Sequence, residues 1–396
     1  MLGFKLIFSL AIIVALGPAA IDMYLASMPD MAKELHTYYA STQMTLTVFL
    51  IFMGMGQLVF GPISDAIGRK TPLLFGLVVY LIASFAAALA PQLETLILAR
   101  VFQGIGASMA IVVVMSMVRD LSSGTEAAQL YALLNTIVAL GPIVAPAIGG
   151  FVGAHYGWRG VMCLLGIFAV VVLINTLFNL KESLAVQQRI ALNIRSILKT
   201  YVEIAFDKQF LFNLLALSTV YFFLFAYIGG SSFVYQNYYG LSTEQFGLVF
   251  GLTSIFLIIG ASSSAYFVKK MPISRLAILG AVIMMLGTVV CISMYALDFG
   301  LIGTVSGIAL GLLGLGILEA TLMAIAMDIR DADLGSSAAL LGAIPMLLSS
   351  IATPIAGYLV EIELLYWLML LSFIGPFILI LVWLGTKKCP PHCIKF

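Results

Sequence analysis

Long apolar segments recur along the chain and limit its fold more than any other feature. A helix needs about 20 apolar residues to cross a bilayer, and the sequence divides into twelve segments of about that length. We place them near residues 5–27, 43–64, 73–90, 95–118, 130–153, 160–180, 209–234, 246–268, 275–296, 300–326, 336–359 and 364–385. Charged residues make up 9% of the chain, against roughly 25% in soluble domains. A water-soluble enzyme is therefore excluded, and an all-α polytopic membrane protein is predicted.

The first segment also resembles a signal peptide, because a basic residue is followed by an apolar run. Its apolar run continues beyond the length of a signal-peptide core, to about Ala26. We therefore interpret it as a retained first span.

The segments form two sets of six. The longest polar interval, 181–208, separates the sets, and adding about 204 to each start in the first set gives each start in the second within a few residues. We predict two pseudo-symmetric six-helix bundles, at 1–180 and 209–385, with a cytoplasmic linker at 181–208 and a cytoplasmic tail at 386–396. Duplicated halves are typical of transporters that work by alternating access. The alternative is an evenly spaced polytopic chain without that role.

Lysine and arginine predict the orientation. With the N-terminus inside, the outer loops hold Lys33 and Arg159. The inner side holds Lys5, Arg69, Lys70, Arg119, Lys181, Arg189, Arg195, Lys199, Lys208, Lys269, Lys270, Arg275, Arg330, Lys387, Lys388 and Lys395. Because basic residues accumulate on the cytoplasmic side, both termini are expected in the cytoplasm.

Three ionisable residues fall well inside the spans. They are Asp22, Arg100 and Glu319, and charge at that depth usually marks a functional site. Asp22 and Arg100 lie at similar depth on faces of small or polar residues, so we interpret Asp22 as a proton carrier tuned by Arg100. The alternative is a structural ion pair that neutralises two buried charges. Glu319 either contacts a cavity and joins the proton coupling or anchors its helix at the inner interface.

The loop after the second span is predicted to form a cytoplasmic gate. It holds Gly61, Asp65, Gly68, Arg69 and Lys70. Glycine permits a tight reversal between two helices, and a carboxylate beside basic residues can join helix ends by charge-assisted hydrogen bonds. We expect this gate to stabilise the outward-facing state.

The fifth span carries small residues and prolines. Gly141, Ala145, Gly149 and Gly153 recur at a spacing of four residues, which lets another helix approach closely. Bending by the prolines at 142 and 146 predicts a pivot where the two halves seal. Ordinary helix packing is the alternative.

Two of these motifs resemble those of a known family. Gly61 to Lys70 resembles the G-x-x-x-D-x-x-G-R-[KR] signature of the major facilitator superfamily. Arg100-Val-Phe-Gln103-Gly104 resembles that family's fourth-helix R-x-x-Q-G motif, whose arginine is implicated in proton transfer.

Two further strings narrow the resemblance. Gly141-Pro142, continuing through Pro146 to Gly149-Gly150, resembles the fifth-helix motif of exporters that run as antiporters. Asp22-Met23-Tyr24-Leu25, followed by Pro29, is similar to the first helix of the bicyclomycin/chloramphenicol-resistance (Bcr/CflA-type) branch of drug:proton antiporters.

The resemblance implies the major facilitator fold and a function. We expect a monomer in a bacterial inner membrane that exports small hydrophobic or amphipathic compounds, driven by the proton motive force without a cofactor. One alternative is a dedicated exporter of a single metabolite, such as a siderophore, sugar or amino-acid derivative. Another is a nontransporting membrane receptor or embedded enzyme, although no catalytic constellation is visible.

Aromatic residues of the seventh span are expected to hold the substrate. Tyr221, Phe225 and Tyr227 offer ring faces that suit amphipathic or cationic molecules. We add Tyr24 and Gln103 from the first half as substrate contacts. Each aromatic residue alone is more often lipid-facing or part of an interface belt.

Other partners are not expected. A net charge of +1 gives no argument for nucleic-acid binding. Cys389, His392 and Cys393 lie together in the tail, but three ligands without a second pair are a weak metal signal. We predict no metal site.

Overall fold

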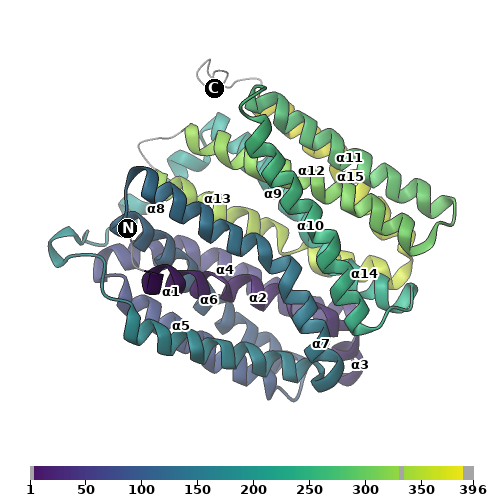
Figure 1. Ribbon diagram of the computed structural model, residues 1–396, viewed down its shortest axis with the longest axis horizontal. Helices are drawn as coiled ribbons and strands as arrows, with labels where there is room; N and C mark the ends of the chain where they lie inside the picture. The colour runs from purple at the N-terminus through teal and green to yellow at the C-terminus, as the bar shows by residue number, and fades with distance from the viewer. Residues whose placement is uncertain (1–3, 330–333, 387–396) are drawn as a thin grey trace. The chain divides into compact units, whose positions relative to one another are not determined.

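The computed structural model describes residues 4–329 and 334–386, which form helices joined by short loops (Figure 1). Their contacts define two compact units. Unit 1 comprises the chain up to residue 197 together with 243–248, and unit 2 comprises 198–242 and the chain from 249 onward. Arg330 and the tail from 387 on, with Cys389, His392 and Cys393, lie outside the described residues.

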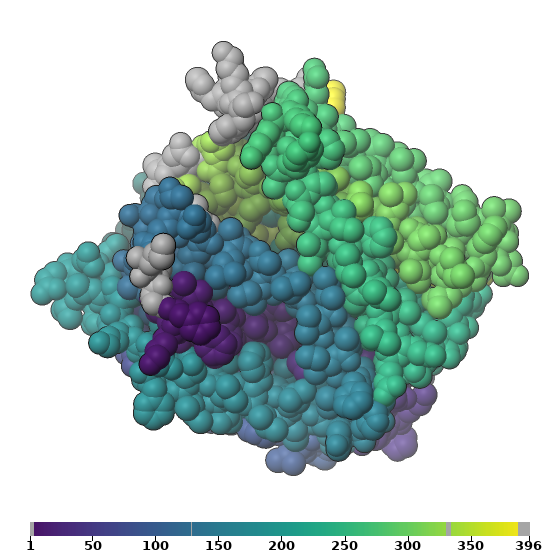
Figure 2. Space-filling model, in the orientation of Figure 1, coloured from purple at the N-terminus to yellow at the C-terminus, as the bar shows by residue number. Residues whose placement is uncertain are grey.

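Unit 1 contains the spans of the first half. Its helices are α1 (Phe4–Val14), α2 (Leu16–Asp22), α3 (Met28–Glu34), α4 (Tyr39–Ile67), α5 (Lys70–Ala88), α6 (Leu93–Leu121) and α7 (Gly124–Asn179). Two short 3₁₀ turns, at Leu25–Ser27 and Val186–Gln188, precede α3 and follow α7. Within the unit α1 packs on α7, and Figure 2 shows the purple start of α1 at the surface beside blue side chains of α7.

Unit 2 contains the spans of the second half, and α8 (Ile194–Ala205) crosses the boundary between the units. The later helices are α9 (Lys208–Phe233), α10 (Thr243–Phe267), α11 (Ile273–Ala296), α12 (Gly300–Asp328), α13 (Leu334–Ser349), α14 (Ala352–Ile362) and α15 (Leu364–Thr386). A π-helical turn at Val234–Tyr238 ends α9. The helix α8 falls inside the interval that we expected to be a linker.

The all-α polytopic prediction is confirmed. In the described part of the chain, eleven helical stretches are long and apolar enough to cross a membrane. The predicted fifth and sixth spans fall together in α7, which is 56 residues long. Inside it Gly157 has φ 66° and ψ −179°, a conformation that is essentially restricted to glycine. The two spans are therefore separated by a single-residue kink and not by a loop.

Prolines divide two other spans. Proline has no backbone N–H, so the carbonyl four residues earlier loses its helical partner. Pro18 thereby frees the carbonyl of Val14, where α1 ends, and Pro354 frees that of Ser350, between α13 and α14. The first span was predicted at 5–27, whereas its broken helix continues to Glu34.

The duplication is visible in the packing of each unit. A Cβ atom on Gly76 of α5 would lie 3.1 Å from the carbonyl oxygen of Gly106 in α6. A Cβ atom on Gly280 of α11 would lie 3.1 Å from the carbonyl oxygen of Gly314 in α12. The same close backbone approach therefore recurs in both units. Gly76 and Gly280 are related by the repeat, and their partners Gly106 and Gly314 lie one helical turn out of that relation.

Replacing Gly157 by alanine should destabilise the protein. Because nothing lies within 4 Å of the new Cβ position, the cost comes from backbone strain alone, at about 1–3 kcal/mol. Thermal unfolding of the purified variant should show it as a lower melting temperature.

Gly61→Ala is the matched control, because Gly61 lies inside α4 and its Cβ would lie 3.6 Å from Val112 of α6, an ordinary van der Waals contact. We expect no loss of stability there. Equal melting temperatures for Gly157→Ala and the parent would contradict the kink.

Candidate functional site

The guanidinium of Arg100 is the centre of a buried polar cluster in unit 1. Arg100 lies in α6 and has 0% exposed surface. Its Nη2 donates to the carbonyl of Ala20 at 2.9 Å and its Nε to that of Thr45 at 3.3 Å, while Nη1 donates to Gln103 Oε1. Because these acceptors belong to α2, α4 and α6, one side chain connects three helices.

Two aromatic rings face the same guanidinium. Its central carbon lies 4.5 Å from the ring centroid of Tyr24 and 4.3 Å from that of Phe49. Such contacts stabilise a cation that has lost its water. The positive charge of Arg100 is thus surrounded by carbonyl oxygens and ring faces.

The cluster extends to α5. Gln103 Nε2 donates to Ser84 Oγ at 2.8 Å, and Tyr80 Oη donates to the carbonyl of Leu16 at 3.3 Å. Tyr24 Oη lies 3.3 Å from Thr45 Oγ1. Tyr24 and Gln103, which we predicted as substrate contacts, are fully buried here. In this structure both contact Arg100.

Asp22 lies at the end of α2, next to this cluster. It is 3% exposed and follows Ala20, the carbonyl partner of Arg100, by two residues. Among the described residues the Asp22 carboxyl forms neither an ion pair nor a hydrogen bond, so the ion pair with Arg100 that was the alternative interpretation is not formed in this structure. A buried carboxyl in this position is available to a proton or to a cationic ligand.

The glycine ridge of α7 packs against the segment that carries Asp22. Cβ atoms on Gly141 and Gly149 would overlap Pro18 and the carbonyl of Met23, respectively. Gly150 faces Thr243, in the first turn of α10 that groups with unit 1.

Pro142 and Pro146 lie inside α7. The residue with non-helical backbone angles in that helix is Gly157. The pivot role of the two prolines stays a prediction.

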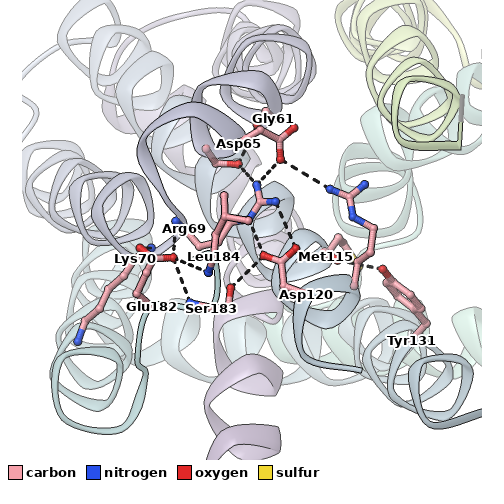
Figure 3. Close-up of polar contacts among 12 residues, drawn as sticks. Gly61, Asp65, Arg69, Lys70, Met115, Asp120, Tyr131, Glu182, Ser183 and Leu184 are labelled. Atoms are coloured by element: carbon pink, nitrogen blue, oxygen red, sulfur yellow. Dashed lines mark hydrogen bonds and ion pairs between the residues drawn. The ribbon is translucent and has the colours of Figure 1, made fainter. Parts of the chain in front are cut away.

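The predicted gate residues form a network around Arg69 (Figure 3). Arg69 is 1% exposed, and its Nη1 lies 2.6 Å from Asp65 Oδ1 while its Nε lies 2.8 Å from Asp120 Oδ2. Nη1 also donates to Ser64 Oγ at 2.8 Å, and Ser64 Oγ donates to the carbonyl of Gly61 at 2.8 Å. The guanidinium therefore joins the ends of α4 and α6.

Glu182 completes the network from the chain after α7. Its carboxylate accepts the backbone N–H groups of Arg69 and Lys70 at 2.8 and 3.1 Å. Gly68 has φ +104°, and a Cβ there would lie 2.6 Å from Glu182 Oε2. Lys70 Nζ donates to the carbonyl of Leu177 in α7 at 3.3 Å. Position 68 therefore requires glycine for two reasons: its backbone has a positive φ angle, and a side chain would collide with the Glu182 carboxylate.

The environment shifts two pKa values in this network. For Arg69, burial alone would lower the pKa, but the hydrogen bonds and charges of Asp120 and Asp65 outweigh it and raise the pKa. For Glu182, burial would raise the pKa, but backbone N–H donors, those of Arg69 and Lys70 among them, lower it below its ordinary value of 4.5.

Sequence reasoning missed Asp120 and Glu182. They lie 51 and 113 residues from Arg69 along the chain. The available signal was that both are acidic residues, Asp120 in the last turn of α6 and Glu182 just after α7, on the side of the membrane predicted for Arg69. Every partner of Arg69 belongs to unit 1.

In unit 2 the structure brings together two residues that were predicted for different roles. Tyr221 Oη in α9 donates to Glu319 Oε1 in α12 at 2.8 Å. The ring of Phe225, one turn further along α9, lies 6.4 Å from that of Tyr221. Tyr227 is fully buried and stacks on Phe250 at 5.2 Å. Glu319 is partly buried and hydrogen-bonded inside the unit.

Asp120→Asn should destabilise unit 1. The change removes the charged acceptor of Arg69 Nε, and a lost hydrogen bond to a charged group costs about 1.5–3 kcal/mol. A lower midpoint in thermal unfolding of the purified variant would measure it.

Asp30→Asn is the control, because Asp30 pairs with Lys33 at 3.4 Å with both side chains more than half exposed. Such pairs contribute little. Equal losses in the two variants would contradict the assigned role of Asp120.

Glu182 should make stability depend on pH. Because its pKa is lower in the folded protein, its contribution is present above the ordinary value of 4.5 and is lost as the pH falls through the folded-state value. Melting curves of the parent and of Glu182→Gln should therefore differ at neutral pH and converge in acid. A difference that persists unchanged into acid would contradict this assignment.

In the described part of the chain no three His, Cys, Asp or Glu side chains come together as metal ligands would. Unit 1 holds a buried carboxyl beside a caged arginine and a charged network at the helix ends. Unit 2, taken by itself, holds a tyrosine–carboxyl pair.

Comparison with known proteins identifies the family of this chain. An uncharacterized MFS-type transporter of Bacillus subtilis, YdgK, is 33% identical over 89% of this chain and 88% of its own length. A bicyclomycin resistance protein homolog of Haemophilus influenzae is 26% identical over 86% of each chain. The crystal structure of a D-xylose-proton symporter superposes with a TM-score of 0.74 over 98% of each chain, at 16% identity. The Major Facilitator Superfamily model matches residues 10–334, and the chain belongs to that superfamily of membrane transporters.

Proposed function

We propose that this protein is a proton-coupled exporter of small hydrophobic or amphipathic compounds, a drug:proton antiporter. The observation that carries the proposal is Asp22, a buried carboxyl without an ion pair, beside the Arg100 cluster of a superfamily member. The relative named for bicyclomycin resistance supports the direction and the substrate class.

Asp22 carries the proton in this proposal, and Arg100 couples it to the helices. Arg100 holds the carbonyl of Ala20, so the turn before Asp22 is tied to α6. A change of charge at Asp22 acts on a segment that also packs against Gly149 of α7. Protonation therefore biases the arrangement of α2, α6 and α7 together.

The proton gradient supplies the driving force without a cofactor. One proton that moves down a potential of 100 mV releases about 2.3 kcal/mol, which can maintain roughly a fiftyfold gradient of substrate. Asp22 loads its proton from the outer side, where substrate leaves, and releases it inward when the site turns inward and new substrate arrives. The two six-helix bundles alternate between inward- and outward-facing states.

The network around Arg69 keeps the predicted gate role. Because each of its partners lies in unit 1, it fastens the ends of α4, α5, α6 and the chain after α7 to one another. Unit 1 then moves as one body when the inner side closes in the outward-facing state.

Glu319 is assigned a supporting part in proton coupling. Its partner Tyr221, with Phe225 and Tyr227, supplies the polar and aromatic contacts for substrate in the second half. Tyr24 and Gln103 supply those of the first half.

The excess of basic residues in alternate loops supports an inner-membrane protein with both termini in the cytoplasm. The protein acts as a monomer in this proposal.

Asp22→Asn should abolish coupled export. In proteoliposomes the parent should concentrate substrate against its gradient and move protons when substrate is added, because the carboxyl exchanges a proton during each cycle. The amide cannot do so. Substrate accumulation and the pH of the medium measure the difference, with bicyclomycin and chloramphenicol among the compounds.

Asp30→Asn, an exposed carboxyl in α3, should export like the parent. An Asp22→Asn variant that remains coupled would remove Asp22 from the mechanism. Transport of one polar metabolite alone, with no effect on toxic compounds, would replace the drug exporter by a dedicated one.

A further inference from the structure

A short amphipathic helix lies between the two sets of spans. α8 covers Ile194–Ala205, and α9 begins at Lys208. The end of α8 therefore lies beside the start of a membrane span. None of the roles described above uses this helix.

One apolar stripe of α8 is covered by protein. Ile204 is buried, and Ile197 and Tyr201, on the same face, are half-buried. Residues three and four apart share a face of a helix, so this stripe is the packing face.

A second apolar stripe is uncovered. Ile194, Leu198 and Val202 follow one another at a spacing of four residues and are 64%, 57% and 55% exposed. Just outside the helix, Ile190 and Phe206 are 68% and 74% exposed. So much contiguous apolar surface is unfavourable in water and marks an interaction surface.

Basic residues border the uncovered stripe. At about 100° per residue, Arg195 and Lys199 follow Ile194 and Leu198 around the helix, and both are exposed. Lys199 lies 3.7 Å from Glu203, a pair with 76% and 56% exposed side chains, and such pairs contribute little. The positive edge is therefore available to a negative partner.

We propose that α8 lies in the membrane interface, with Ile194, Leu198 and Val202 among the acyl chains and Arg195 and Lys199 at the phosphates of anionic lipids. A helix with an apolar stripe beside basic residues is the form that binds such interfaces. Its position directly before α9 holds it at the depth where headgroups meet the acyl chains. The partner is the lipid surface, whatever compound the protein transports.

The test measures the depth of two positions of α8. Nitroxide labels are placed at Leu198→Cys and, as the matched control on the polar face, at Glu203→Cys, in full-length protein whose native cysteines are replaced by alanine. The protein is reconstituted in phosphatidylcholine vesicles with and without phosphatidylglycerol. Collisions with oxygen, which partitions into lipid, are compared with collisions with a water-soluble nickel chelate.

We expect the label at 198 to be accessible to oxygen and shielded from nickel, and the label at 203 to show the reverse. Arg195→Gln with Lys199→Gln should weaken the contrast in phosphatidylglycerol vesicles, since each basic residue near an anionic surface contributes about a fivefold change in binding. Nickel access at both positions would overturn the proposal. Shielding of position 198 from both reagents, or shielding that depends on the ratio of protein to lipid, would assign the stripe to protein contact.

Hydrogen exchange in the chain with its native cysteines provides a second measurement. The α8 amides should exchange more slowly in vesicles that contain phosphatidylglycerol, and Leu198→Glu should remove that protection. Equal exchange in both vesicle types, for the parent and the variant, would also overturn the proposal.

Discussion

A positive charge that is kept inside an apolar bundle needs many oxygen atoms or ring faces around it, because the surrounding medium stabilises it poorly. Arg100 meets this requirement with backbone carbonyls of α2 and α4, the amide oxygen of Gln103 and the rings of Tyr24 and Phe49. These groups belong to separate helices, so the demand of one side chain sets how α2, α4 and α6 are placed. Asp22 keeps its carboxyl outside this cage.

The two units use their polar groups differently. Unit 1 has two buried arginines, Arg100 in its cage within the bundle and Arg69 in the network at the helix ends. In unit 2 the described spans hold a tyrosine–carboxyl hydrogen bond between Tyr221 and Glu319. The backbones of the two units nevertheless share the same close helix contacts at Gly76 and Gly280. The duplicated scaffold is therefore common to both, and the charges are not.

The fold was largely predictable from the sequence, because a span must be about 20 apolar residues long whatever its neighbours are. The exception in α7 depends on the backbone angles of one residue, Gly157, which hydropathy does not report. The sequence also pointed to Asp22, Arg100 and Arg69, which the structure buries, since a charge in or beside a span is costly. Their partners were not: Arg100 bonds to backbone carbonyls, which every residue carries. Arg69 pairs with acidic residues from segments that are distant in the sequence. The helix α8 was missed because its charged residues led us to interpret the interval as a polar linker.

The Arg69 network also bears on the order in which the protein is made. Its members, from Asp65 to Glu182, all precede the second half in the chain, and domains generally fold as units, the N-terminal one first, during synthesis. The charged ends of α4, α5 and α6 can therefore find their partners while the later spans are still being translated. The Arg69 side chain can therefore be buried and paired before the complete protein has been made. The nascent first half can then shield Arg69, which protects the chain from early misassociation or degradation.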